Sequence, residues 1–317
     1  KDGNEEYEYL TLYRAEADFC DEFLLELDID GDATTIANTE PYWFRAYMNW
    51  RKDEVNLPGN TTTASDGWGF INPTKTFAQA FARHDGNSIR RRANVATYSE
   101  VYHDFPYLSE SARGVMSSGL FENEGYFRMK YYDFVDDVVP ERFASGQTNG
   151  NTTNFPLMRY ADVLLMYAEA CCMSGEGTAN ISGLEALNKV RQRAGLTPAP
   201  ALDMDNEEYG IKAERRFELW LDDCDRYVDL IRWGDYKDFI TDTSDKGVSE
   251  HWGNEGVWLL GMKDKNVRTD DPLDVSNYEV RYDPLSVRGS WNDRLYLFPF
   301  PYAETTQNPN LNQNTGW

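Results

Sequence analysis

The fold class of this chain is decided by residues 157–170, which read Leu157-Met-Arg-Tyr-Ala-Asp-Val-Leu-Leu-Met-Tyr-Ala-Glu-Ala170. Ala161, Leu164, Leu165 and Ala168 recur there at spacings of three and four, so they share one face of an α-helix. We therefore predict a helix over about 158–173. The small, glycine-rich residues that follow are typical of a helix end.

Two further helices are predicted after this one. Ser182 is suited to cap the start of the second helix, in which Leu187 and Val190 continue an apolar stripe. The short link predicts that the first two helices form a hairpin. A third, long helix is predicted from about 206 to 233, ending at Gly234. The three helices together predict an all-α packing unit.

The chain before this unit shows weaker patterns. Residues 22–30 are predicted to pass from a helix into a strand. A short helix over 73–81, capped by Asn72, is predicted because Phe77 and Phe81 share one face. Residues 98–153 are predicted to be mostly irregular, with a strand-like patch at 126–134.

The chain after this unit is predicted to be loops laid over the helices, over 235–290. A tail follows, which Pro299 and Pro301 should keep extended. The predicted fold class is mostly α, with helices covered by a large loop-rich region and a few short strands. We divide the sequence into an aromatic-rich region expected to bind ligand (1–153), the helical unit (154–234) and a loop-rich region with the tail (235–317), packed as one body.

The charge of the chain excludes one class of partner. The 317 residues carry 31 Lys and Arg against 54 Asp and Glu, a net charge of -23, which repels a phosphate backbone. Nucleic acid is therefore not an expected partner. No stretch approaches the roughly 20 apolar residues that span a bilayer.

Metal and cofactor chemistry has little support in the sequence. The cysteines form no Cys-x-x-Cys pair and the histidines have no metal-type spacing: Cys20, Cys171, Cys172 and Cys224; His84, His103 and His251. Asp28-Ile-Asp-Gly-Asp32 invites a calcium hypothesis, but its glycine is at the fourth position and Thr39 is at the twelfth, which does not fit an EF-hand. A solvated acidic turn is favoured, and no metal or cofactor is predicted.

Three segments in order resemble the SusD/RagB family, the surface glycan-binding lipoproteins that partner TonB-dependent outer-membrane transporters in Bacteroidetes. They are 155–170 with 186–196, 214–221 leading into 226–234, and 298–304 followed by 308–317. The first resembles the family's last tetratricopeptide-like hairpin, the second its Glu-Arg-Arg helix and Asp-Leu-x-Arg-Trp-Gly ending, and the third its closing signature. Asp222-Asp-Cys-Asp departs from the family's shorter link and puts the local helix turn in doubt.

The resemblance implies a function and a location. It implies a protein on the outer membrane that binds an oligosaccharide or polysaccharide, passes it to the transporter and catalyses nothing. It also implies that the chain is the C-terminal portion of a longer protein, with further helical hairpins and a lipidated cysteine upstream. The lipid anchor would then be its only link to the membrane.

Sugar recognition needs flat aromatic faces and planar hydrogen-bonding groups. Both are concentrated between residues 42 and 72, and a second aromatic cluster follows His251. The candidate ligand-binding residues are Trp43, Trp50, Trp68, Trp252, Tyr42, Tyr47, Asn49 and Asn72. A tryptophan in such a region is also often a core residue. The candidates are predicted from composition and position in the sequence alone.

Two other functions have less support in the sequence. A glycan-processing hydrolase would need paired carboxylates in a cleft, and no catalytic sequence motif is present. A helical-repeat adaptor would need a sustained repeat, and one hairpin is too little. Arg90-Arg-Arg92 is interpreted as a basic island paired with the acidic surface, and the charges of the third helix as scaffold ion pairs: Arg215, Arg216, Glu218, Asp229 and Arg232.

Overall fold

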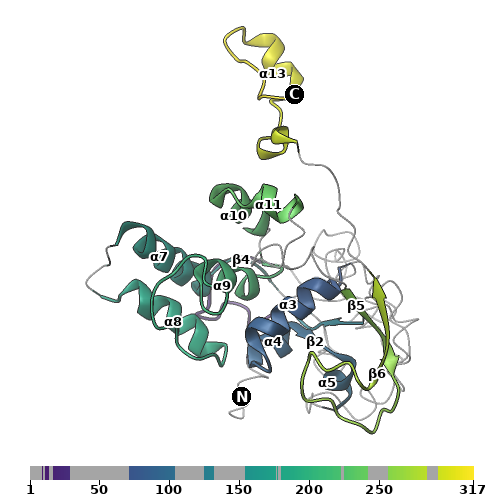
Figure 1. Ribbon diagram of the computed structural model, residues 1–317. Coiled ribbons are helices and arrows are strands. Elements are labelled where there is room, and N and C mark those ends of the chain that lie inside the picture. Colours follow the sequence, from purple (N-terminus) through teal and green to yellow (C-terminus); the bar gives the residue numbers. More distant parts are fainter. Residues whose placement is uncertain are drawn as a thin grey trace, which may run out of the picture. The chain divides into compact units, whose positions relative to one another are not determined.

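The computed structural model describes residues 9, 11–13, 17–28, 71–103, 125–131, 154–175, 177, 180–222, 225–241, 256–283 and 292–317 (Figure 1). The chain divides into two compact units, Lys1–Asp223 with Val257–Asp283, and Cys224–Gly256 with Pro284–Trp317. The division of the sequence at 153 and 234 stays a prediction.

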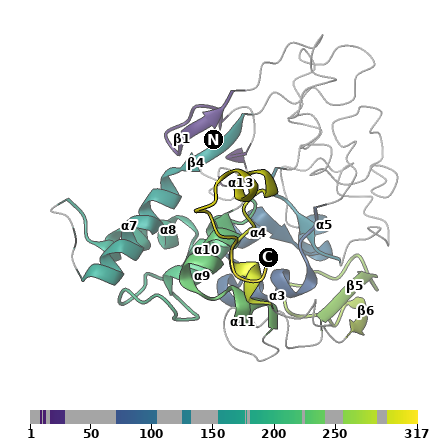
Figure 2. The ribbon, with the colours of Figure 1, turned by 90° about the horizontal axis from the view of Figure 1, so that it is seen from above.

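The first unit contains the predicted helical hairpin. Its helices α7 (Tyr160–Ser174) and α8 (Gly183–Arg193) lie side by side in both views (Figures 1 and 2). Helix α8 begins with a capping box, in which Ser182 and Glu185 each accept a hydrogen bond from the other's backbone N–H. A Cβ on Gly183 would lie 2.4 Å from the Cβ of Cys171, so glycine permits this close approach. The hairpin prediction is confirmed.

A short sheet precedes α7 and corrects its predicted start. Strand β4 (Phe155–Arg159) pairs antiparallel with β1 (Phe23–Leu27), as Figure 2 shows. The helix was predicted from 158, but Arg159 is extended, with φ -112° and ψ 155°. The strand predicted within 22–30 is confirmed, whereas Glu22 lies in a turn and not in a helix.

The third predicted helix is two helices, α9 (Ile211–Glu218) and α10 (Asp225–Trp233). The prediction of one helix over 206–233 was wrong because Leu221 has φ +63°, a left-handed conformation that a right-handed helix excludes. The carboxylate of the next residue, Asp222, is held by ion pairs. In the first unit, α9 packs against both α7 and α8.

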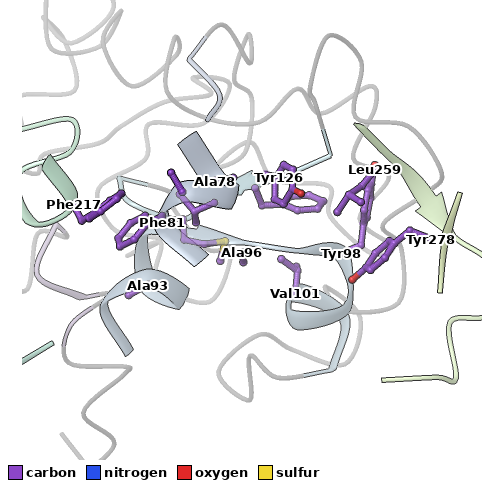
Figure 3. Packing of buried hydrophobic residues seen from close by; sticks show 14 of the residues in the cluster. Ala78, Phe81, Ala93, Ala96, Tyr98, Val101, Tyr126, Phe217, Leu259 and Tyr278 are labelled. Atoms are coloured by element: carbon purple, nitrogen blue, oxygen red, sulfur yellow. The ribbon is translucent and has the colours of Figure 1, made fainter. Parts of the chain in front are cut away.

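A second core of the first unit lies around helix α3 (Lys75–Asp85). Its other elements are α4 (Ile89–Asn94), β2 (Val95–Ala96), α5 (Tyr98–His103) and β3 (Phe127–Arg128), with β2 and β3 paired antiparallel. Phe81 of α3 stacks on Phe217 of α9, with ring centroids 4.7 Å apart (Figure 3). In the strand-like patch predicted at 126–134, Phe127–Arg128 form a strand, and residues 132–134 lie outside the described residues.

Helix α3 confirms the short helix predicted near residue 73 but corrects its cap. The hydroxyl oxygen of Thr74 accepts a hydrogen bond from the N–H of Phe77 at 3.2 Å, so Thr74 is the N-cap. Asn72 was predicted in this role and lies two residues too early. Phe77 and Phe81 do share one face, with ring centroids 5.7 Å apart.

The region predicted to be loops contains regular structure. Strands β5 (Gly256–Met262) and β6 (Tyr278–Asp283) pair with each other, and Leu259 and Tyr278 reach the core shown in Figure 3. The loop prediction for 235–290 was therefore wrong in these strands and in α11 (Tyr236–Thr241). The many Gly, Asp and Asn residues around the two strands favour turns, which is why the sequence predicted loops there.

The second unit contains α10, α11, the short 3-10 helix η6 (Asp293–Tyr296) and α13 (Tyr302–Gln307). The side chain of Gln313 both accepts from the N–H and donates to the carbonyl of Phe300, at 2.7 and 2.9 Å. Side-chain hydrogen bonds therefore hold the extended tail up to Pro301. Helix α13 begins at the next residue, so the prediction of an extended tail was wrong there.

Among the described residues, none of the helices combines the length and apolar character needed to cross a bilayer.

Removal of a core side chain tests the packing of the helical hairpin. Leu165 is fully buried between α7 and its neighbours, whereas the adjacent Met166 is 41 % exposed. Leu165→Ala should lower the free energy of unfolding by about 2–5 kcal/mol, and Met166→Ala by less than about 1 kcal/mol. Urea unfolding followed by circular dichroism measures both, and equal losses would contradict the described packing.

Candidate functional site

The structure places one of the predicted ligand-binding residues. Asn72 is half-buried and directly precedes the buried Pro73 at the start of α3. The other seven candidates lie outside the described residues: Tyr42, Trp43, Tyr47, Asn49, Trp50, Trp68 and Trp252. Whether those seven contact a ligand stays a prediction.

The backbone beside Asn72 is bonded to the second core. The buried side chain of Arg128, in β3, donates from Nε to the carbonyl of Ile71 at 3.0 Å. The same guanidinium donates from Nη1 to the carbonyl of Lys130. Ile71 also packs against the aromatic cluster of Tyr13 and Tyr131. The described end of the predicted binding region is therefore fixed by side chains from another part of the chain.

A buried charge network, which includes Lys130, joins distant parts of the first unit. It consists of Asp85, Arg90, Lys130, Arg159, Glu214, Glu218 and Asp222. All of these side chains are at most 10 % exposed. Helix α9 supplies both glutamates, from positions 214 and 218.

One end of the network is centred on Arg90. Its guanidinium donates two hydrogen bonds to the carboxylate of Asp85, at 2.9 and 2.8 Å. It also donates to Glu214 at 2.8 Å and to Glu218 at 3.3 Å. Glu214 receives a second guanidinium, from Arg191 of α8. These charge-assisted bonds join α3, α4, α8 and α9.

The other end is centred on Arg159, at the junction of β4 and α7. Its guanidinium donates to Glu218 at 3.1 Å and to Asp222 at 2.9 and 2.6 Å. The ammonium of Lys130 lies 2.8 Å from Asp222 and donates to the carbonyl of Trp220 at 2.6 Å. Asp222 also accepts from the hydroxyl of Tyr13 at 2.9 Å. These contacts hold the chain where α9 ends.

The environment shifts the pKa values of these groups. Burial alone would raise the pKa of Glu218, but the guanidiniums of Arg159 and Arg90 outweigh it and lower this pKa to about 2. The same opposition lowers the pKa of Asp85, beside Arg90, and of Asp222, beside Arg159. Burial lowers the pKa of Lys130 to about 8, against the attraction of Asp222.

These pKa directions bear on the hydrolase hypothesis. A glycosidase needs a carboxylic acid whose pKa is raised, so that it can donate a proton near neutral pH. Three carboxylates of the network have lowered pKa values because arginine or lysine side chains pair with them: Asp85, Glu218 and Asp222. These three carboxylates are therefore unsuited to act as a general acid.

The network bears on two predictions about charged residues. Arg90-Arg-Arg92 was interpreted as paired with the acidic surface, but Arg90 and Arg91 are buried and pair with internal carboxylates. Glu218 and Arg215 of the predicted third helix form ion pairs with other elements, which agrees with a scaffold role, and Asp229 and Arg232 pair with each other at 2.7 Å. One sequence signal indicates that the two glutamates are buried. Glu214 and Glu218 occupy the i+3 and i+7 positions of the apolar stripe that begins at Ile211.

Metal and thiol chemistry adds no site in the described part of the chain. No group of three or more His, Cys, Asp or Glu side chains is placed there to hold a metal ion. Cys20, Cys171 and Cys172 are free thiols. The acidic turn at 28–32 lies outside the described residues, apart from Asp28.

Comparison with known proteins gives a family match. The model of the SusD family matches residues 21–317. The chain is 32 % identical over 184 residues to SusD-like protein P25 of Formosa agariphila, covering 56 % of this chain and 28 % of that protein. It is 26 % identical over 167 residues to a SusD-like protein of Bacteroides ovatus, covering 50 % and 29 %. Each of these matches thus covers less than a third of the relative's own length.

Solved structures share the fold. The structure is similar to a SusD-like protein from Bacteroides fragilis, with a TM-score of 0.62 and 20 % identity, covering 100 % of this chain and 58 % of that one. It is also similar to surface glycan-binding protein A from Bacteroides thetaiotaomicron in complex with laminarihexaose, with a TM-score of 0.54 and 20 % identity, covering 96 % and 54 %. The predicted fold class, a mostly helical SusD-like body, is confirmed.

The charge network predicts an acid-sensitive stability. Glu218→Gln removes one buried negative charge that Arg90 and Arg159 share and leaves both guanidiniums with less compensating charge, so the free energy of unfolding near pH 7 should fall by about 3 kcal/mol. Because the pKa of Glu218 is lowered in the folded state, its contribution is complete above the ordinary glutamate pKa and is lost as the pH falls towards about 2. Urea titrations at several pH values should therefore show the gap to wild type narrowing below about pH 4.

The exposed Glu207 provides the matched control. Glu207→Gln should change the free energy of unfolding by less than about 0.5 kcal/mol across the same pH range. A gap between wild type and Glu218→Gln that stayed constant down to pH 2 would contradict the lowered pKa.

Proposed function

The chain belongs to the SusD family, and we propose that it captures an oligosaccharide or polysaccharide at the cell surface without catalysis. The observation that carries this proposal is the family match over residues 21–317. Further support comes from neighbours of the same fold that are named as glycan-binding proteins, one of them in complex with laminarihexaose.

The binding site of this proposal is the aromatic-rich segment between residues 42 and 72, with Trp252 as an additional contact. Trp43, Trp50 and Trp68 would present flat faces to the C–H surface of the sugar rings. Asn49 and Asn72 would provide amide donors and acceptors for neighbouring hydroxyl groups, with Tyr42 and Tyr47 at the rim. Asn72 is half-buried at the anchored end of this segment, which supports its assignment.

The mechanism would be equilibrium capture. Stacking and hydroxyl hydrogen bonds replace contacts with water, so each yields only a small net free energy. Modest affinity and fast release suit a protein that hands its ligand on. We propose that the recipient is a TonB-dependent transporter, and that the protein is held on the outer membrane by a lipid anchor.

The network supports binding over hydrolysis. Hydrolysis requires a proton donor at the glycosidic oxygen, and the carboxylates with shifted pKa values in the network are held ionised by arginine and lysine. A rigid charged interior is instead suited to holding a binding surface in a fixed shape.

Affinity electrophoresis tests the proposal. The chain should be retarded in gels that contain one of a panel of plant, host or microbial polysaccharides. Changing Trp43, Trp50, Trp68 or Trp252 to Ala should abolish or weaken retardation for at least one variant, since stacking on an aromatic face contributes on the order of 1 kcal/mol. Tyr302→Ala removes an aromatic side chain that is 83 % exposed and is not one of the residues of the proposed site, so it should leave retardation unchanged.

Three results would contradict the proposal. Migration unchanged by every polysaccharide would remove glycan capture as the activity. Release of reducing ends over hours would favour a hydrolase. Capture of a peptide with no response to glycan would favour the adaptor hypothesis.

A further inference from the structure

We infer that Arg128 is a positioning residue for Asn72, acting through the carbonyl of Ile71. The inference rests on the proposed function, because it assumes that Asn72 contacts a glycan. Arg128 itself would touch no ligand, since its side chain is fully buried.

The contact between Arg128 and Ile71 joins two distant parts of the chain. Nε of Arg128 donates to the carbonyl of Ile71 at 3.0 Å, across 57 positions of sequence. Nη1 of the same guanidinium donates to the carbonyl of Lys130. Because a guanidinium is planar and rigid, the two carbonyls are held in a fixed relation to each other.

The turn that carries Arg128 is itself firmly held. Lys130 lies 4.4 Å from the ring centroid of Tyr13 and donates to the carbonyl of Trp220 at 2.6 Å. Tyr131 has φ +61° and packs against Tyr13, with ring centroids 4.5 Å apart. The residues around Arg128 are therefore fixed to the turn that follows α9 and to the aromatic cluster of Tyr13 and Tyr131.

The cost of this arrangement argues for a role in positioning. A non-glycine residue in the left-handed region costs roughly 1–2 kcal/mol, and Tyr131 and Leu221 both adopt it within one aromatic cluster. Two cations, Arg128 and Lys130, are also buried there, although apolar residues of similar volume would often be as stable. Such costly local conformations concentrate where a protein holds a binding group in place.

Asn72 is the residue that this arrangement places. The carbonyl immediately before it is held by Arg128, and immediately after it come the buried Pro73 and Thr74, the N-cap of α3. The backbone of Asn72 is thus fixed on both sides. An amide can bond two sugar hydroxyls at once only in one orientation, so a fixed backbone lowers the entropy cost of binding.

A double-mutant cycle on glycan affinity tests the inference. The dissociation constant is measured by affinity electrophoresis for wild type, Asn72→Ala, Arg128→Met and the double variant, at a temperature where all are folded. Asn72→Ala and Arg128→Met should each weaken binding by about tenfold, and the double variant should be no weaker than Asn72→Ala alone. Arg128→Lys keeps a single donor for the Ile71 carbonyl and should recover part of the affinity.

A stability control separates positioning from folding. Leu187→Ala removes a buried side chain of α8, in the other core of the unit. It should lower the melting temperature as much as Arg128→Met or more, and leave the dissociation constant unchanged. If Arg128→Met does not fold, Arg128→Lys and Arg128→Gln replace it in the cycle. The side chain of Gln is shorter than that of Lys, so Arg128→Gln is the variant expected to lose the bond to the Ile71 carbonyl.

Each remaining outcome decides the question. Unchanged affinity in the Arg128 variants, losses that multiply in the double variant, or an Asn72→Ala variant that binds normally would each overturn the inference while leaving glycan capture intact. A wild-type chain that binds no glycan, when each polysaccharide of the panel is tested, would overturn the proposed function and this inference with it.

Discussion

The rest of the first unit depends on the ion pairs between α9 and two arginines, Arg90 and Arg159. Glu218 contacts both guanidiniums, at 3.3 and 3.1 Å, inside a space that excludes water. Loss of one partner from such a pair leaves a buried charge uncompensated, which costs about 3–5 kcal/mol. The position of α9 is thus specified by charge as well as by apolar packing, and both cores of the unit meet at this helix.

The same network determines where the chain can change direction. Asp222 is bound by Arg159, Lys130 and Tyr13, which stabilises the left-handed Leu221 just before it. The ion pairs that end α9 therefore also hold the turn at Lys130, beside the guanidinium that fixes Ile71. The proposed binding segment, which ends at Asn72, would be anchored by this arrangement.

Much of the helical unit could be predicted from the sequence because its signals are local. The stripe around Leu165 and the N-cap at Ser182 act within one or two turns, and both are confirmed. The break at Leu221 and the burial of Arg90 depend on partners more than 60 positions away, which periodicity does not reveal. The candidate site was chosen by aromatic composition alone, and of its residues only Asn72 has a described position.

The most direct test of this account is a crystal structure of the chain with a bound oligosaccharide chosen from the polysaccharide that retards it. The account predicts a sugar ring stacked on at least one of Trp43, Trp50 and Trp68, with an oxygen or nitrogen of the Asn72 amide within hydrogen-bond distance of a hydroxyl. A sugar bound elsewhere on the chain, with no contact to residues 42–72, would contradict it.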